Sequence, residues 1–358
     1  MLTLTQRLQA EIDRANATTN GSDTTVHDAI SNLIGGYNSL AQRITNTLTE
    51  YSNNNVTSIS NYAFNSCSSL TSVNLQSVTS IGDYAFGDCS SLASINLPSV
   101  TSVNTGAFKN CSSLTSVDLP VLTSIGGCAF QTCSTLTSVN LPAVTSVDAM
   151  AFYQCTNLKT VNLPIVTTFS SNAFTYCSSL TIIDLPALTS VGSSTFSSCT
   201  ALTSVNLPAL INGSSSTFSG CSSLTTIDLP ALTSVGSSTF SSCKLLTSVN
   251  LPLVTSVGSG AFSSCKALAT IDLPLATSIA QSAFYNCTKL STLILRSNTL
   301  CTLANTNAFS SSGIASGTGY VYVPSNLVDS YKNADNWSTY ANQIRAIEDY
   351  PDICGVVE

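Results

Sequence analysis

A spacing of 22 residues governs most of this 358-residue chain. Phenylalanine recurs at that interval from Phe64 to Phe284, and cysteine keeps the same interval from Cys67 to Cys287. Between them runs one phrase, repeated ten times without a change of length, whose first copy begins Cys67-Ser-Ser-Leu-Thr-Ser-Val-Asn-Leu. A chain with a fixed short period stacks like residues above like, so we expect a solenoid in which each unit contacts only its neighbours.

Each copy of the phrase is expected to supply one strand of a parallel sheet. In the first copy Leu70, Val73 and Leu75 should point inward, and the polar residues between them should face out. A proline follows the strand in most copies and ends it, because proline has no N–H to donate to a neighbouring strand. Ala85 and Phe86 should fill the far side of the coil, where a short helical turn and an extended arm fit the residues equally.

The full phrase is Leu-x-x-φ-x-Leu-Pro, then φ-x-x-Ile-Gly-x-x-Ala-Phe-x-x-Cys, where φ is an apolar residue. A period of 20–29 residues around Leu-x-x-φ-x-Leu is the signature of leucine-rich repeats. The phrase resembles the BspA-like class of bacterial leucine-rich repeats over about 250 of the 358 residues. The resemblance implies a repeat solenoid and a non-catalytic recognition or adhesion role, directed at a host protein, another bacterium or a glycan.

Three segments are predicted from these patterns. Residues 1–50 form a helical N-terminal cap or attachment segment, residues 51–312 the leucine-rich repeat solenoid with a parallel β-sheet on one face, and residues 313–358 a C-terminal cap. Within the cap, residues 320–323 have the pattern of a strand and residues 326–347 that of a helix, and Trp337 should cover the apolar end of the stack. This strand-then-helix order also resembles the cap that closes BspA-like arrays.

The N-terminal segment carries apolar residues spaced alternately by four and three, as in a heptad seam. These residues are Val26, Ile30, Leu33, Tyr37, Leu40 and Ile44. The seam fits either a helix packed on the open end of the solenoid or an oligomerisation or anchoring module, so a homo-oligomer through these helices is one prediction. The N-terminal helices also resemble the openings of phage tail or fibre proteins. His27, beside the seam, is expected to be a solvated helix residue.

Composition excludes several classes of partner. Charged residues make up 8% of the chain, against about 25% in ordinary soluble domains. A net charge of −7 without basic clusters argues against nucleic acid and anionic membranes as partners. No run reaches the ~18 consecutive apolar residues of a membrane span. A conventional signal peptide is not visible, although the implied role predicts an extracellular location, on a cell surface or on a virion.

Eleven of the fourteen cysteines occupy one column of the repeat. Stacked neighbours in a column lie about 4.8 Å apart with parallel side-chain directions, whereas a disulfide needs Cβ atoms about 3.8 Å apart and a specific torsion. A linear column also cannot supply the four converging ligands of a zinc site. We therefore predict a ladder of buried thiols that behave as apolar residues. Outside the column, Cys301 and Cys354 are the one pair considered for a disulfide.

The outward columns carry two further expectations. The eighth residue of each copy is always Asn or Asp, and no two Asp are adjacent, as a stack that avoids opposed like charges would require. Candidate ligand contacts are Tyr84, Lys109, Tyr153 and Tyr176, at the variable positions around the recurring phenylalanine, and Lys159 on the strand face. The alternative for the strand face is a solvated polar sheet without a ligand.

Catalysis is not expected. With one histidine, the chain cannot form a His-based triad or a two-His metal site elsewhere, and it has no phosphate-binding glycine loop, so no cofactor is predicted. A recognition or adhesion protein is the preferred interpretation. The alternatives are a tail-associated component of a virion that binds the host, and a structural rod or self-assembling spacer.

Overall fold

The computed structural model describes residues 48–354, which form two compact units. Unit 1 comprises residues 48–166 and 176–178, and unit 2 comprises residues 167–175 and 179–354. The N-terminal seam, His27 and the helices predicted before residue 48 lie outside the described residues. The predicted boundaries at residues 50 and 312 do not coincide with the division into units and stay predictions.

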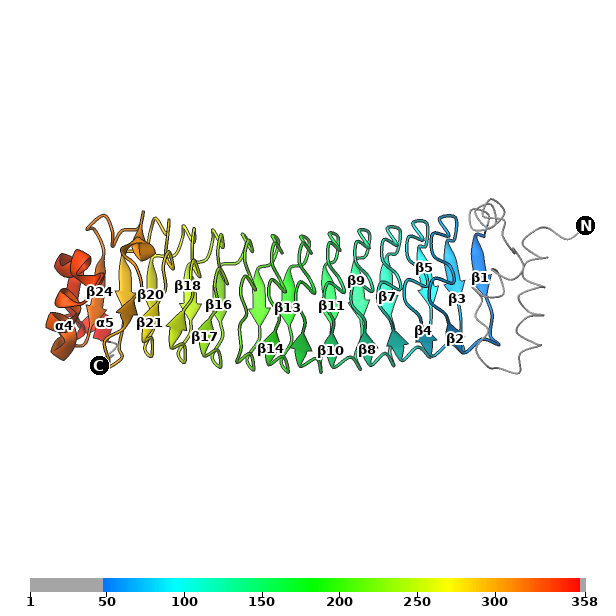
Figure 1. Ribbon diagram of the computed structural model, residues 1–358, viewed down its shortest axis with the longest axis horizontal. Coiled ribbons are helices and arrows are strands. Elements are labelled where there is room, and N and C mark those ends of the chain that lie inside the picture. The colour runs from blue at the N-terminus through cyan, green and yellow to red at the C-terminus, as the bar shows by residue number, and fades with distance from the viewer. Residues whose placement is uncertain (1–47, 355–358) are drawn as a thin grey trace, which may run out of the picture. The chain divides into compact units, whose positions relative to one another are not determined.

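Unit 1 is a stack of coils, each contributing a three-residue strand and a two-residue strand (Figure 1). The longer strands are β1 (Glu50–Ser52), β3 (Ser72–Asn74), β5 (Ser94–Asn96), β7 (Ser116–Asp118), β9 (Ser138–Asn140) and β11 (Thr160–Asn162). The shorter strands are β2 (Ser58–Ile59), β4 (Ser80–Ile81), β6 (Ser102–Val103), β8 (Ser124–Ile125) and β10 (Ser146–Val147). All pairs are parallel: β1-β3-β5 and β7-β9-β11 among the longer strands, and β2-β4-β6-β8-β10 among the shorter.

Unit 2 is built from the same repeated coil. Its longer strands are β13 (Ile182–Asp184), β15 (Ser204–Asn206), β16 (Thr226–Asp228), β18 (Ser248–Asn250), β20 (Thr270–Asp272), β22 (Thr292–Ile294) and β24 (Tyr320–Val323). Its shorter strands are β12 (Thr168–Phe169), β14 (Ser190–Val191), β17 (Ser234–Val235), β19 (Ser256–Val257), β21 (Ser278–Ile279) and β23 (Thr302–Leu303). Partners again lie one repeat apart in parallel register, as in Thr226↔Ser248. The predicted solenoid and its parallel sheet are confirmed, and the sheet of two-residue strands is an addition to the prediction.

The far side of each coil is neither helical nor extended. It is a six-residue turn segment, such as residues 83–88, whose second and sixth residues have left-handed backbone. The φ angle at these two positions runs from 51° at Tyr84 to 76° at Gly220. Between them, Phe86 N donates to Ala107 O of the next coil at 2.7 Å, while Ala85 N turns back to Gly82 O. The turn segments therefore form a third hydrogen-bonded ladder along the stack.

The core of each unit is a column of stacked phenylalanine rings. In unit 1 the rings of Phe64 and Phe86 are 5.1 Å apart and within 1° of parallel, and the stack continues to Phe152. In unit 2 it runs from Phe174 to Phe309. Offset stacked rings at this distance add to the energy of burial. The inward phenylalanine column is therefore confirmed.

The cysteine column lies beside the rings and satisfies backbone carbonyls. Each thiol from Cys89 to Cys287 donates to the carbonyl of the phenylalanine 25 residues earlier, at distances from 2.9 Å for Cys287 to 3.3 Å for Cys199. The cysteines from Cys67 to Cys301 are free thiols, and those of the column are buried. The predicted thiol ladder is confirmed, and the thiols also act as donors to buried acceptors that would otherwise lack a second partner.

The C-terminal cap closes unit 2, and its helix is broken where the sequence predicted a continuous one. It contains η1 (Thr306–Phe309), η2 (Ser325–Leu327), α4 (Val328–Asn333), η3 (Trp337–Gln343), β25 (Ile344–Ala346), η4 (Ile347–Asp349) and α5 (Pro351–Cys354). Asn336, with a φ of 63°, reverses the chain after α4 so that Trp337 packs on Phe309 at 5.8 Å. Trp337 Nε1 also donates to Cys301 O at 2.7 Å. Trp337 thus covers the end of the ring stack, as predicted.

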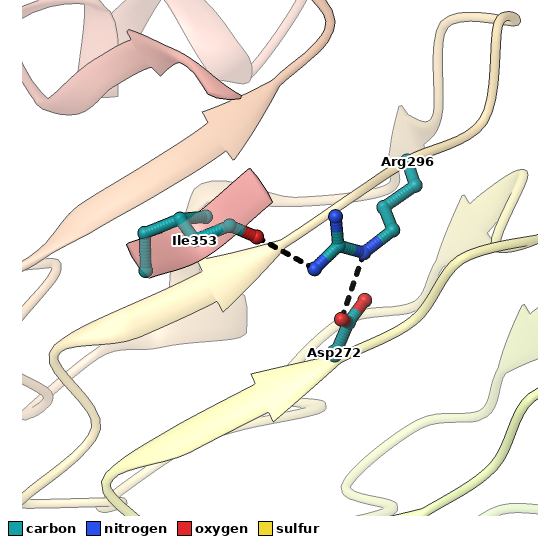
Figure 2. A network of polar contacts seen from close by, with 3 residues as sticks. All are labelled: Asp272, Arg296 and Ile353. Atoms are coloured by element: carbon teal, nitrogen blue, oxygen red, sulfur yellow. Dashed lines mark hydrogen bonds and ion pairs between the residues drawn. The ribbon is translucent and has the colours of Figure 1, made fainter. Parts of the chain in front are cut away.

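Arg296 links the sheet of unit 2 to the last helical turn. Its Nε donates to Asp272 Oδ2 at 2.8 Å, and its Nη2 donates to Ile353 O at 2.8 Å (Figure 2). Ile353 packs against a small apolar cluster of Ile294, Tyr322 and Ile347. The segment that follows η4 is therefore held on the outward face of β22 and β24.

Substitution of Phe152 by Ala should lower the free energy of unfolding by about 3–5 kcal/mol, because it removes a fully buried ring from the stack. Thr137→Ala, on the exposed side of β9, should change it by no more than about 0.5 kcal/mol. Thermal or urea unfolding of both variants measures the difference. Equal losses in the two variants would contradict the assignment of inward and outward columns.

Two glycine substitutions should have opposite effects. Gly213 occupies a column held by Val191 and Val235, has no left-handed φ, and an added Cβ would meet a movable Leu232 methyl at 3.1 Å. Gly213→Ala should therefore raise the unfolding free energy by about 0.4–1 kcal/mol. Gly106→Ala should lower it by about 1–2 kcal/mol, because Gly106 has a φ of 62° and its Cβ would lie 2.5 Å from the Tyr84 ring. Differential scanning calorimetry checks the two signs.

Candidate functional site

We name as the strand face the outward residues of the longer strands and the residues that flank them. The threonine hydroxyls of this face donate hydrogen bonds to backbone carbonyls within the stack. Thr137 N and Thr137 Oγ1 both donate to Thr115 O, at 2.9 and 3.0 Å. A second threonine column, beside the shorter strands, repeats the arrangement, as Thr101 does on Thr79 O. These hydroxyls shield the outer backbone carbonyls from water, so fewer donors remain on this face for a ligand.

The Asn and Asp column forms a ladder of side-chain hydrogen bonds. Asn140 Nδ2 donates to Asp118 Oδ1 at 2.8 Å. In the same way, Asn206 donates to Asp184, and Asn250 donates to Asp228. Each of these Asp residues is therefore followed by an Asn that supplies a donor. The last one, Asp272, is followed by Ile294, and Arg296 supplies the donor instead. The predicted separation of carboxylates is confirmed, and the ladder gives its physical reason.

The opposite surface differs between the units. We name the turn face of unit 1 as the turn segments 61–66, 83–88, 105–110, 127–132 and 149–154 together with Tyr176. Its left-handed positions carry varied side chains: Tyr62, Ser66, Tyr84, Asp88, Gly106, Asn110, Cys128, Thr132, Met150, Gln154 and Tyr176. The equivalent positions of unit 2 carry only Ser, Asn and Gly. Chemical variety at the left-handed positions is thus confined to unit 1 within the described repeats, although Tyr285 of unit 2 is exposed at another position of its turn segment.

The five predicted ligand contacts lie at three separate places. Tyr153 and Tyr176 come together, with ring centres 5.6 Å apart and planes at 88°. Tyr84 stacks instead on Tyr62, at 5.4 Å and 5°, and Lys109 follows it one repeat later at a partly exposed position. Lys159 is exposed on the strand face, in the column of Thr137. The assignment of these residues to a ligand remains a prediction.

Tyr62, half exposed, is a surface aromatic residue that the sequence reasoning missed. Its position precedes the first complete copy of the phrase, where the period is incomplete. One feature of the sequence indicates the left-handed positions. The residue before each column cysteine is often Asn, Asp, Gly or Ser; Asn, Asp and Gly tolerate left-handed backbone best, and Ser is small. Periodicity of apolar residues alone does not report this.

A second aromatic group lies on the outward side of the cap strands. The Arg345 guanidinium lies 4.5 Å from the centre of the Tyr320 ring, and Tyr350 contacts Tyr322 edge-on at 5.1 Å. Arg345 also donates to the carbonyls of Asn342 and Ile344 beside the last strand. The group is largely occupied by contacts within the cap, so it stabilises the end of unit 2.

The buried thiols of Cys155 and Cys243 are protonated in the folded chain at neutral pH. Burial raises the pKa of Cys155 and of Cys243 to about 12, against about 8.5 for a free thiol. Burial likewise raises the pKa of Cys301 to about 12. Cys301 is a free buried thiol, and the side chain of Cys354 lies outside the described residues, so their pairing stays a prediction.

No cluster of three or more His, Cys, Asp or Glu residues suited to a metal ion occurs within residues 48–354. Across the same residues, no helix has the length and apolar character needed to cross a bilayer.

The buried thiols should make the protein labile to alkali. Their folded pKa is raised, so the unfolded chain loses thiol protons first, and stability that is complete below about pH 8.5 is lost as the pH rises toward 12. Each thiol should then contribute about 1.4 kcal/mol of destabilisation per pH unit. In urea unfolding from pH 7 to 11, the double variant Cys155→Ala, Cys243→Ala should show a shallower decline than the wild-type chain. Parallel declines in the two chains would contradict this account.

Comparison with known proteins places these features in context. The family model for the BspA-type leucine-rich repeat region, which spans six copies, matches residues 46–159, 101–214 and 211–334. None of the curated proteins matches the sequence. The matched region includes both units and does not extend to the N-terminal seam, so the resemblance to phage tail proteins gains no support from it.

Solved structures that are similar to this chain include two bacterial proteins. A leucine-rich repeat protein from Bacteroides ovatus is 26% identical, with 82% of this chain and 88% of that chain covered and a TM-score of 0.55. A leucine-rich cell surface protein from Faecalibacterium prausnitzii is 22% identical, with 82% of each chain covered and a TM-score of 0.45. The first of these likenesses supports the fold.

Proposed function

This chain belongs to the BspA-type leucine-rich repeat family, and we propose on that premise that it is a non-catalytic recognition or adhesion protein. In this proposal it presents its repeat surface outside the cell, to a host or bacterial surface protein or to a glycan. The role needs no cofactor, because the repeat supplies a stable surface rather than a reactive group.

The observation that carries the proposal is the contrast between the two faces of unit 1. The strand face is built of threonine and asparagine columns whose donors are used within the stack. The turn face of unit 1 varies from repeat to repeat and exposes aromatic, amide, thioether and charged side chains. Variation at exposed turns on a constant scaffold is typical of binding surfaces. We therefore assign the candidate contacts Tyr84, Lys109, Tyr153 and Tyr176 to this face.

The alternative functions have less support. A rod that grows end to end requires an open C-terminal end, but in unit 2 Trp337 and Tyr340 cover Phe309, and Arg345 donates to carbonyls beside the last strand. The virion hypothesis rests on the N-terminal segment, and the family match adds nothing to it. A homo-oligomer through the seam from Val26 to Ile44, which lies outside the described residues, remains part of the proposal.

The test is a binding screen with the full-length chain. Biotinylated protein is applied to an array of purified extracellular and cell-surface proteins and, in parallel, to a glycan array. We expect saturable binding to at least one target, unchanged to within about twofold by Lys159→Thr and Ile182→Ser, which restore the prevailing residue types of the strand face. Absence of saturable binding on both arrays would refute the recognition role. Loss of binding after Lys159→Thr and Ile182→Ser would show that the contact surface is the strand face instead.

A further inference from the structure

The left-handed positions of unit 1 carry more bulk than the backbone needs. In unit 2 the same two positions of the turn segment are filled by Ser, Asn and Gly, and the hydrogen-bonded ladder is the same. Bulky or β-branched residues with positive φ are outliers, and strained backbone tends to cluster at functional sites. Tyr84, Met150 and Thr132 have φ angles of 51°, 59° and 59°. The turn conformation therefore does not require the large side chains at these positions of unit 1.

The tyrosine rings of this face are arranged in a way that suits a protein partner better than a sugar. One face of the Tyr84 ring is stacked on Tyr62, and Gly106 lies against its other side, where an added Cβ would be 2.5 Å from Cε1. A sugar that stacks on an aromatic residue needs an open ring face, and Tyr84 offers its edge and hydroxyl. Tyr153 and Tyr176 also contact each other, with the edge of one ring against the face of the other.

The amino-acid composition of the turn face also favours a protein partner over a sugar. Tyrosine set among Ser, Asn and Gly is the composition of antibody binding loops, in which tyrosine gives rigid contact area and the small polar residues give adaptable hydrogen bonds. Met150 adds a polarizable apolar group suited to protein contacts. The rings are also preorganised by stacking, which reduces the entropy lost on binding.

The charged residues of the turn face indicate the charge that a partner's surface should carry. Unit 1 contains five carboxylates and two lysines among its described residues, and of these Asp83, Asp88 and Lys109 lie on the turn face, which therefore has one carboxylate in excess. On the turn face, Asp83 Oδ1 accepts from Thr105 N at 3.1 Å and Asp88 Oδ1 accepts from Asn110 Nδ2 at 2.7 Å, so both carboxylates are held in place. A fixed negative charge beside tyrosine edges complements lysine or arginine on a partner.

We propose that the turn face of unit 1 is the contact surface for a folded protein whose own surface carries lysine or arginine, and that it binds through tyrosine edges and fixed carboxylates. This inference rests on the recognition role proposed above and adds the surface and the class of partner. The strand face then serves as scaffold.

The experiment uses full-length variants on the two arrays described above, with each protein target spotted untreated and enzymatically deglycosylated. The turn-face variant combines Tyr62→Ser, Tyr84→Ser, Met150→Ser and Tyr176→Ser, which install the residue found at the equivalent places of unit 2. The matched control combines Val121→Ser and Ile165→Ser, which are exposed residues of unit 1 outside the turn face. Thermal unfolding checks that both variants are folded.

We expect wild-type binding to a protein target that survives deglycosylation and weakens with added salt. The turn-face variant should bind at least about tenfold more weakly, and the control should stay within about twofold of wild type. Binding confined to glycans, or equal binding by the turn-face variant, would overturn this inference and leave the recognition role intact. If the wild-type chain binds nothing on either array, the recognition role fails and this inference fails with it.

Discussion

Hydrogen bonding between successive coils is the interaction on which the whole structure depends. Each coil offers three rows of backbone groups, from the longer strand, the shorter strand and the turn segment, and each row pairs with the coil beside it. Buried backbone groups are costly when unpaired, so the coils must share one length. The constant 22-residue period satisfies that requirement, and the stacked phenylalanines and thiols follow from it. The side chains that vary from repeat to repeat point outward and take no part in these three hydrogen-bonded rows.

This arrangement explains how an almost uncharged chain presents an ordered surface. The polar columns are hydrogen-bonded within the stack. Threonine hydroxyls donate to backbone carbonyls of the preceding coil, and asparagine amides donate to the Asn or Asp side chain of the preceding coil. Among the described residues, Asp118, Asp184 and Asp228 accept hydrogen bonds from the asparagines of the ladder, and the ion pair of Arg296 with Asp272 joins the sheet of unit 2 to its cap. Sites that the ladders do not need, such as Tyr62 and Tyr176, are free to vary.

The features that follow from side-chain period were predictable from the sequence. The inward Leu70, Val73 and Leu75, the buried thiols and the covering role of Trp337 all depend on repetition and polarity, which the sequence displays directly. Backbone dihedral angles are not displayed in this way. The left-handed residues, the two-residue strands and the reversal at Asn336 depend on φ and on hydrogen bonds between distant residues. The pairing of Tyr84 with Tyr62 was missed because it crosses the edge of the first complete repeat.

The ladder of Asn and Asp side chains also restricts how the gene for such a chain can grow. Copying a repeat that bears Asn, such as the one around Asn162, adds a residue that both donates and accepts, and the ladder continues. Copying a repeat that bears Asp, such as the one around Asp228, would set two carboxylates against each other and leave the first of them without an asparagine donor. Arrays of this kind should lengthen most readily by duplicating their neutral units, so their acidic positions record where duplication has been disfavoured.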